Sequence, residues 1–260
     1  MAKEPRKIKA IEVGCEILAE LQEREGARVN ELAEALDRSE PTVHTYLNTL
    51  KERGYVEKDG YVYKIGLKFL PIGEYARNRE ELYLAGRDEV DSLADTSGEY
   101  VHLITERRGR QIKLYEDYGD VAVATKHHTR QREFRQYLHR SAAGKAILAE
   151  FPAAKVDQII DEHGLEGATE NTITDRETLL NELDSVREQG YATNDQELTM
   201  GLRSVAASII GPDNHVRGAI SISAPLERCK EETFHETYPE MIRKSSNVIQ
   251  INIDTENYFF

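Results

Sequence analysis

An Asp-Gly pair constrains the first quarter of this chain more than any other feature. Asp59-Gly60 separates residues 55–58 from residues 61–65, and apolar and polar side chains alternate in both flanking segments. A two-residue type I′ turn needs positive φ angles at both central positions, and an Asp-Gly pair supplies residues that tolerate them. The sequence therefore predicts a two-stranded β-hairpin at residues 55–65.

Three short helical patterns precede this hairpin. The first ends at Gly26, the second covers residues 29–36, and the third covers residues 42–53. Ser39 suits the N-cap of the third helix, and Pro41 is tolerated beside it because first-turn amides have no partner within a helix. Three helices followed by a hairpin predict a winged helix-turn-helix domain over residues 1–67.

The third helix has an apolar face and a polar face. Val43, Leu47 and Leu50 recur at helical spacing and form the face expected to be buried. Short hydrogen-bonding side chains on the other face suit base edges and phosphates. We expect base contacts from Thr42, His44, Thr45 and Asn48, phosphate contacts from Arg38, Lys51 and Lys58, and a further DNA contact at Ser39. The alternative is a winged helix that serves only protein contacts or dimerisation.

These residues resemble a known protein family. Residues 39–56, SEPTVHTYLNTLKERGYV, resemble the recognition helix of IclR-type transcriptional regulators, and YKIGL at residues 63–67 continues the likeness. The resemblance implies a dimer, or a dimer of dimers, whose third helices enter successive major grooves of operator DNA. Many family members carry a basic residue where this chain has Thr45.

The charge of the chain at first argues against a nucleic-acid partner. The chain has 34 basic and 47 acidic residues and a net charge of −13, whereas phosphate contacts need Lys and Arg. Residues 1–70 hold 12 basic and 13 acidic residues, so −1 lies in this stretch and −12 in the remainder. This asymmetry predicts a domain boundary and removes most of the objection to DNA. Abundant acid, more Arg than Lys and no Trp predict a protein from a halophilic prokaryote, soluble at high salt.

The rest of the chain predicts a linker and an α+β domain. Residues 68–86 are helical in pattern, and the resemblance makes them a linker and dimerisation helix, although a surface helix of the second domain is the alternative. Residues 87–260 alternate helices with strands of a mainly antiparallel sheet. Within them LHRSAAGKAILA (138–149), GYATNDQELTMGLRSVAA (190–207) and GAISISAP (218–225) resemble the GAF-like effector-binding domain of the same family.

These three segments predict a small-molecule site. A helix beginning at Ala142 would present free amides to an anion, and Ser221 and Ser223 face the same side of a strand. In the resemblance Ser204 stands where some members have Cys, and Asn194 where some have an acid. The expected effector residues are Ala142, Ala143, Gly144, Asn194, Asp195, Ser204, Ser221 and Ser223. The family likeness implies a sugar, sugar acid, aromatic acid or keto acid that controls catabolic genes by repression or activation.

Other functions are less well supported by the residues. We expect no metal and no cofactor, because the adjacent His127 and His128 would point to opposite faces of a strand and no other histidines have ligand spacing. Lys145 is expected in solvent, or alternatively at an effector carboxylate. A sensor acting without DNA, or an enzyme on a GAF-like domain, remain the alternatives. Without a membrane-length apolar run, we expect a cytoplasmic protein.

Overall fold

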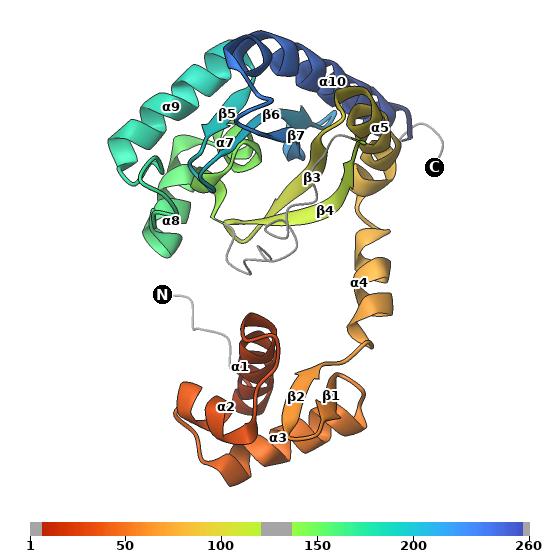
Figure 1. Ribbon diagram of the computed structural model, residues 1–260, viewed down its shortest axis with the longest axis vertical. Helices are drawn as coiled ribbons and strands as arrows, with labels where there is room; N and C mark the ends of the chain where they lie inside the picture. The colour runs from red at the N-terminus through yellow and green to blue at the C-terminus, as the bar shows by residue number, and fades with distance from the viewer. Residues whose placement is uncertain (1–6, 121–136, 257–260) are drawn as a thin grey trace. The chain divides into compact units, whose positions relative to one another are not determined.

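Figure 1 shows the computed structural model of the chain, which describes residues 7–120 and 137–256. The chain divides into two compact units, Met1–Ala76 and Arg77–Phe260. Among the helices described, none is both long enough and apolar enough to cross a membrane. A helical N-terminal unit with a hairpin and a C-terminal unit with an antiparallel sheet give the α+β class that the sequence predicts.

The N-terminal unit is a winged helix-turn-helix. Helices α1 (Lys9–Glu23), α2 (Val29–Ala35) and α3 (Glu40–Glu52) precede the strands β1 (Val56–Asp59) and β2 (Val62–Ile65). Buried side chains from all three helices and both strands form its core, with Ile17, Leu21, Leu32, Val43, Leu47, Val56 and Tyr63 among them. The predicted apolar stripe of the third helix therefore packs against α1, α2 and the hairpin, which leaves its polar face outward.

The hairpin turn lies one residue later than predicted. Asp59 pairs with Val62, so the two central residues are Gly60 and Tyr61. Only Gly60 has a positive φ, 59°, which matches a type II′ turn with Gly in first place rather than the predicted type I′ turn. The side chain of Tyr61 consequently stands at the tip of the wing, where it is 81% exposed.

The predicted helical linker at residues 68–86 consists of parts of two helices. Helix α4 (Phe69–Arg77) ends before α5 (Glu81–Ser97) begins, and the boundary between the two compact units falls at Ala76. Helix α4 has no buried residue. Leu70 and Tyr75 in α4 are 62% and 66% exposed, so an apolar surface of this helix is open.

A five-stranded antiparallel sheet organises the C-terminal unit (Figure 1). Its order is β4-β3-β7-β6-β5, built from β3 (Tyr100–Arg107), β4 (Arg110–Tyr118), β5 (Ala192–Asp195), β6 (Leu202–Ile210) and β7 (Val216–Pro225). The sequence predicted β3, β4, β6 and β7 but not the short edge strand β5. Residues that are distant in the chain therefore meet on neighbouring strands.

Helices cover both faces of this sheet. Helices α5 and α10 (Tyr238–Glu256) pack on one face, against a core that includes Val101, Ile220 and Ile222. Helix α7 (Ala142–Ala149) packs on the other, in a core that includes Ile104, Ala206 and Ala219, and α9 (Arg176–Gln189) packs on α7, with α8 (Ala153–His163) adding Val156 and Ile160 to the same core. The short turns η1 (Leu138–Arg140) and η2 (Thr233–Thr237) precede α7 and α10. Alternation along each strand thus supplies two separate cores.

Candidate functional site

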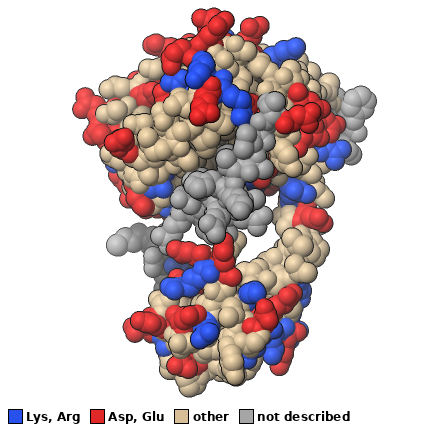
Figure 2. Space-filling model, viewed as in Figure 1, with Lys and Arg blue, Asp and Glu red and all other residues tan. Residues whose placement is uncertain are grey.

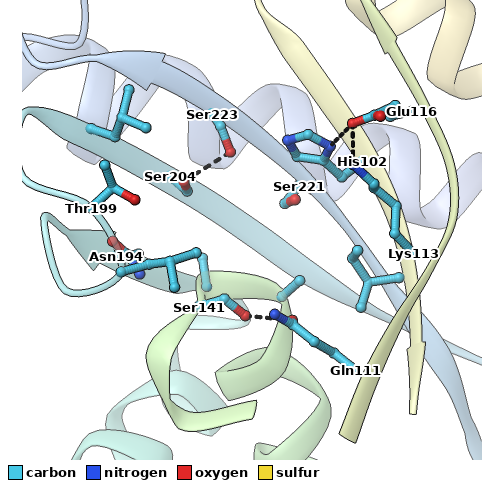
Figure 3. Close-up of a pocket in the computed structure, with 15 residues that line it drawn as sticks. His102, Gln111, Lys113, Glu116, Ser141, Asn194, Thr199, Ser204, Ser221 and Ser223 are labelled. Carbon is cyan, nitrogen blue, oxygen red and sulfur yellow. Dashed lines mark hydrogen bonds and ion pairs between the residues drawn. The ribbon is translucent and has the colours of Figure 1, made fainter. Parts of the chain in front are cut away.

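A cavity of about 120 Å³ lies between the sheet and the start of α7. Strands β3, β4, β6 and β7 form one wall, and the segment 194–202 and α7 close it (Figure 3). Its polar lining residues are His102, Gln111, Lys113, Glu116, Ser141, Asn194, Thr199, Ser204, Ser221 and Ser223, and its apolar ones are Ile104, Ala142, Ala143, Leu198 and Leu202. Such a mixture of apolar surface and a few convergent polar groups is typical of a small-molecule site.

Six of the residues expected to bind an effector line this cavity. They are Ala142, Ala143, Asn194, Ser204, Ser221 and Ser223. Ser204 and Ser223 are cross-strand neighbours whose hydroxyl oxygens lie 2.8 Å apart. The hydroxyl of Ser221 has no partner among the described residues, so it is available to a ligand. Their neighbours Ile220 and Ile222 point into the opposite core, as strand alternation requires.

The structure places the other two expected residues, Gly144 and Asp195, outside the cavity lining. The Asp195 carboxylate pairs with Arg203 across β5 and β6, at 3.0 Å to Nε and 2.9 Å to Nη2, and this hydrogen bonding lowers the pKa of Asp195. Gly144 packs on the turn before α7, where a Cβ atom would lie 2.0 Å from the carbonyl oxygen of Leu138. Both residues hold the fold around the cavity rather than lining it.

The start of α7 presents polar hydrogens to the cavity. The Ser141 hydroxyl accepts a hydrogen bond from the Gly144 amide at 2.9 Å and donates one to Gln111 at 2.7 Å. The amides of Ala142 and Ala143 have no partner within the described residues. Two free donors at the positive end of a helix dipole favour an anionic or oxygen-rich group.

Sequence reasoning missed four polar cavity residues on β3 and β4, which are His102, Gln111, Lys113 and Glu116. Lys113 and Glu116 are three residues apart, so regular alternation would place them on opposite faces. A β-bulge shifts the pairing of β3 with β4, from Leu103 opposite Tyr115 to Ile104 opposite Lys113, and both side chains consequently face the cavity. Nδ1 of His102 lies 3.3 Å from the Glu116 carboxylate, which also pairs with Lys113.

Lys145 is neither in solvent nor in the cavity lining, contrary to both expectations. It is 1% exposed, and its ammonium group lies 2.8 Å from Glu182 and 2.7 Å from Glu197. Burial raises the pKa of Glu197 more than the neighbouring ammonium lowers it. Because Glu197 directly precedes Leu198 and Thr199, this buried ion pair ties α7 to one wall of the cavity.

The expected DNA contacts lie on the surface of the N-terminal unit. Thr42, His44, Thr45 and Lys51 are exposed on α3, and Asn48 is half-buried beside them. Asn48 Nδ2 lies 3.1 Å from His44 Nδ1, and the Thr45 hydroxyl donates to the Pro41 carbonyl at 2.9 Å. The side-chain amide and the imidazole are therefore presented together.

The expected flanking contacts surround this helix. Ser39 is the N-cap residue, but its hydroxyl bonds to the Thr42 hydroxyl at 2.8 Å and caps no amide. Arg38 is half-buried, 3.9 Å from Glu16, and the Lys58 ammonium lies 5.1 Å from the centroid of the Tyr63 ring. Figure 2 shows acidic side chains across the visible face of the C-terminal unit and mixed charges on the N-terminal unit.

Few other groups in the described residues have the character of a reactive centre. His127 and His128 lie outside those residues, and the residues described hold no cluster of three or more His, Cys, Asp or Glu side chains placed to bind a metal. Cys229 is fully buried, and burial raises its pKa to about 12, so its thiol is a poor nucleophile.

Both compact units match models of one protein family. Residues 10–60 match the family description "IclR helix-turn-helix domain", and residues 78–251 match "Bacterial transcriptional regulator IclR C-terminal". The chain is 40% identical over 255 residues to "Probable HTH-type transcriptional regulator ArcR" of Halobacterium salinarum, covering 97% of this chain and 96% of that protein. It is 29% identical over 260 residues to the regulator KdgR of Escherichia coli, covering 99% and 97%.

A solved structure supports the same fold. An IclR homolog from Microbacterium hydrocarbonoxydans, complexed with 4-hydroxybenzoate, superposes with a TM-score of 0.78 at 16% identity and covers 95% of this chain and 100% of that one. The family matches together span both compact units, so the winged helix and the cavity-bearing domain are parts of one family architecture.

Proposed function

The chain belongs to the IclR family of transcriptional regulators, and we propose that it is a dimeric operator-binding protein whose DNA affinity is set by a small acid in the cavity beneath α7. The observation that carries this proposal is the cavity itself, because it combines unpartnered helix-start amides with the hydroxyls of three serines on the sheet. The 4-hydroxybenzoate complex of a family member supports a carboxylic acid as the ligand class.

The DNA contacts in this proposal come from α3 and the wing. His44 and Asn48 offer hydrogen-bonding groups to base edges, together with Thr42 and Thr45, whereas Arg38, Ser39, Lys51 and Lys58 contact the backbone. A gel shift with the DNA upstream of its own transcription unit tests this. Asn48→Ala should reduce binding to that DNA more than to a scrambled duplex, whereas Lys51→Ala with Lys58→Ala should weaken both equally.

Lys155→Ala provides the matched control, because this lysine is exposed on the C-terminal unit. If neither Asn48→Ala nor the double lysine variant alters binding, α3 is not the element that contacts DNA. If the wild-type protein does not shift DNA at all, the protein acts through protein contacts alone, which was the alternative open at the level of the sequence.

The effector part of the proposal is tested by a thermal-shift screen. Sugars, sugar acids, aromatic acids and short keto acids are each added to the protein, and a binder should raise the melting temperature by mass action. Ser221→Ala should reduce the shift caused by a binder while leaving unliganded DNA binding intact. An unchanged shift in Ser221→Ala would place the binding site elsewhere. Ser208→Ala is the control, because Ser208 bonds to Glu150 and does not line the cavity.

Two copies of the chain would pair through the apolar surfaces of α1 and α4. Helix α1 and α3 enclose an open apolar groove of about 470 Å³, and Ile11 at its edge is 62% exposed. With Leu70 and Tyr75 on α4, these side chains make more open apolar surface than isolated exposed residues would. Ile11→Glu with Tyr75→Glu should produce a monomer in sedimentation, whereas Tyr61→Ser at the wing tip should not. A double variant that stays dimeric would overturn this interface.

The charge distribution supports function at high salt. Cations screen charges over about 10 Å at 0.1 M salt and over about 3 Å at 1 M, which relieves repulsion between a chain of −13 and DNA. The 40% identical relative from Halobacterium salinarum is consistent with such an environment. Dialysis to low salt should then reduce the folded signal, and an unchanged melting curve would refute the idea.

A further inference from the structure

The cavity has two polar ends. One is the start of α7, with its free amides at Ala142 and Ala143. The other lies on β3 and β4, where His102 stands between Glu116 and Ser221 on the neighbouring strands (Figure 3). The first end can bind one anionic group of a ligand, and the second polar end of the cavity then has no assigned role.

His102 is held in a fixed orientation at this second end. Its Nδ1 lies 3.3 Å from Glu116, and its ring stacks on that of Tyr100 at 6.3 Å between centroids and 12° between planes. Glu116 stays ionised, because the His102 ring beside it and the hydrogen bond from Lys113 lower its pKa to about 2. A carboxylate that engages one ring nitrogen determines what the other nitrogen can do.

The second ring nitrogen of His102 is available to a ligand. Among the described residues Nε2 has no partner, whereas Nδ1 is buried 3.3 Å from the Glu116 carboxylate, at ion-pair distance but without hydrogen-bond geometry. The side chain lines the cavity and is only 16% exposed, so a group that meets Nε2 does so in a partly desolvated space. A hydrogen bond there discriminates between ligands more than it would in open water.

The β-bulge shows that this arrangement is built into the sheet. Without the shifted register at Leu103 and Ile104, Lys113 and Glu116 would face opposite sides. The bulge brings both onto the cavity side, where the ammonium group of Lys113 pairs with the carboxylate that lies 3.3 Å from Nδ1 of His102. Bulges commonly re-aim side chains beside functional sites.

We propose that His102 hydrogen-bonds a second oxygen-bearing group of the effector, at the end remote from its carboxylate, and thereby makes the cavity selective for short two-ended acids. Glu116 and Lys113 are positioning residues that act through His102. This proposal rests on the proposed function, because it takes the cavity to be the effector site and the α7 amides to hold the carboxylate.

The size of the cavity limits the length of such a ligand. A cavity of 150 Å³ accommodates benzene, so about 120 Å³ suits a short acid of similar or slightly smaller size. Glycerate has the required carboxylate and a hydroxyl on its terminal carbon. Propanoate has the same carbon chain and carboxylate without either hydroxyl. This pair gives the contribution of both hydroxyls, and His102→Phe separates the part that depends on His102.

Calorimetric titration of the full chain with glycerate and with propanoate tests the proposal. Wild type should bind glycerate about tenfold more tightly than propanoate, since one hydrogen bond in a partly desolvated site is worth about this factor. His102→Phe should lose that preference while binding propanoate as wild type does. His102→Gln, which keeps a hydrogen-bonding group at a similar reach, should restore part of it. Glu116→Gln should weaken glycerate binding without affecting propanoate.

The outcomes separate this proposal from the proposed function. Equal binding of glycerate by wild type and His102→Phe overturns the role of His102, and the effector site still stands if Ser221→Ala weakens binding of both acids. If wild type binds both acids equally, or binds neither, the proposed selectivity for short two-ended acids is overturned. The gel shift measures DNA binding independently of that result. If His102→Phe melts at a lower temperature than wild type, two other measurements test the role of His102. One is the binding of glycerate by His102→Gln. The other is the NMR signals of the His102 ring nitrogens in wild type, which should move with glycerate and not with propanoate.

Discussion

Replacing Lys145 by Met should destabilise the C-terminal unit strongly. The ammonium group is 1% exposed and is the shared partner of Glu182 and Glu197. Methionine has a similar length, so it fills much of the space but removes the charge. The two carboxylates would then face each other without a cation, and the Glu197 side chain is only 9% exposed.

The magnitude follows from the difference in exposure between these two carboxylates. Removing one partner of a buried ion pair costs about 3–5 kcal/mol. Glu182 is 28% exposed and regains water, so the expected loss lies near the lower limit, about 3 kcal/mol. For a unit of this size, a loss of about 3 kcal/mol corresponds to a decrease in melting temperature of roughly 6–12 °C.

Urea unfolding of wild type and variant measures this loss. Lys155→Met is the control, since the Lys155 side chain is 43% exposed and losing its pair with Glu106 should cost less than losing the buried pair of Lys145. Adding Glu197→Leu to Lys145→Met should restore most of the stability, because no buried charge is then left at that position. A Lys145→Met loss no larger than that of Lys155→Met would refute the buried ion pair.

The stability lost in Lys145→Met should depend on pH in a defined direction. Burial already raises the pKa of Glu197 in the wild type, so its protonation favours the folded state at low pH, and this contribution is lost as pH rises through the folded-state value. Removing the Lys145 ammonium raises the pKa of Glu197 further, because that neighbouring positive charge lowers it in the wild type. The stability difference between wild type and variant should therefore shrink as the pH falls toward the ordinary glutamate pKa of about 4.3.

Three further predictions concern the cavity and the two cysteines. Gly144→Ala should cost about 1–3 kcal/mol in urea unfolding, because its Cβ would lie 2.0 Å from the Leu138 carbonyl oxygen, whereas Gly73→Ala in α4 has no atom within 4 Å and should not destabilise. Because the pKa of Glu116 is lowered in the folded protein, its carboxylate stabilises the fold above about pH 4.3, and this stabilisation is lost as the pH falls toward about 2. Glu116→Gln should therefore flatten the dependence of the unfolding free energy on pH across that range, by at most about 1 kcal/mol because the side chain is 44% exposed. In the folded variant with Ile11→Glu and Tyr75→Glu, in which the groove beside Cys15 is open, a thiol reagent should modify Cys15 and leave buried Cys229 unmodified until unfolding, and rapid loss of both thiols would contradict the packing around Cys229.

Local patterns in the sequence predicted the elements better than their exact geometry. The hairpin forms where Asp59-Gly60 predicts it, but the turn moves to Gly60 and Tyr61. A type II′ turn needs a positive φ only at its first central residue, which glycine supplies without steric cost. Asp59 consequently keeps an extended conformation and pairs within the strand.

Long-range contacts account for what the sequence did not predict at the cavity. Lys145 is 37 residues from Glu182 and 52 from Glu197, so its helix alone predicted a solvated lysine. Lys113 and Glu116 share a face only because of a register shift opposite Leu103 and Ile104, and no local alternation reveals it. Ser221 and Ser223 were predictable because strand alternation alone places them. The family likeness supplied Asn194 and Ser204, but Asp195 takes a cross-strand arginine instead.

Hydroxyl-radical footprinting on the DNA upstream of its own transcription unit tests the central claim most directly. A dimer that presents two α3 helices should protect two symmetric half-sites whose centres are about 10–10.5 base pairs, or a multiple of that spacing, apart. The protection should disappear with the double lysine variant Lys51→Ala and Lys58→Ala. Uniform cleavage at protein concentrations that saturate the gel shift, or protection of a single half-site, would contradict dimeric operator binding.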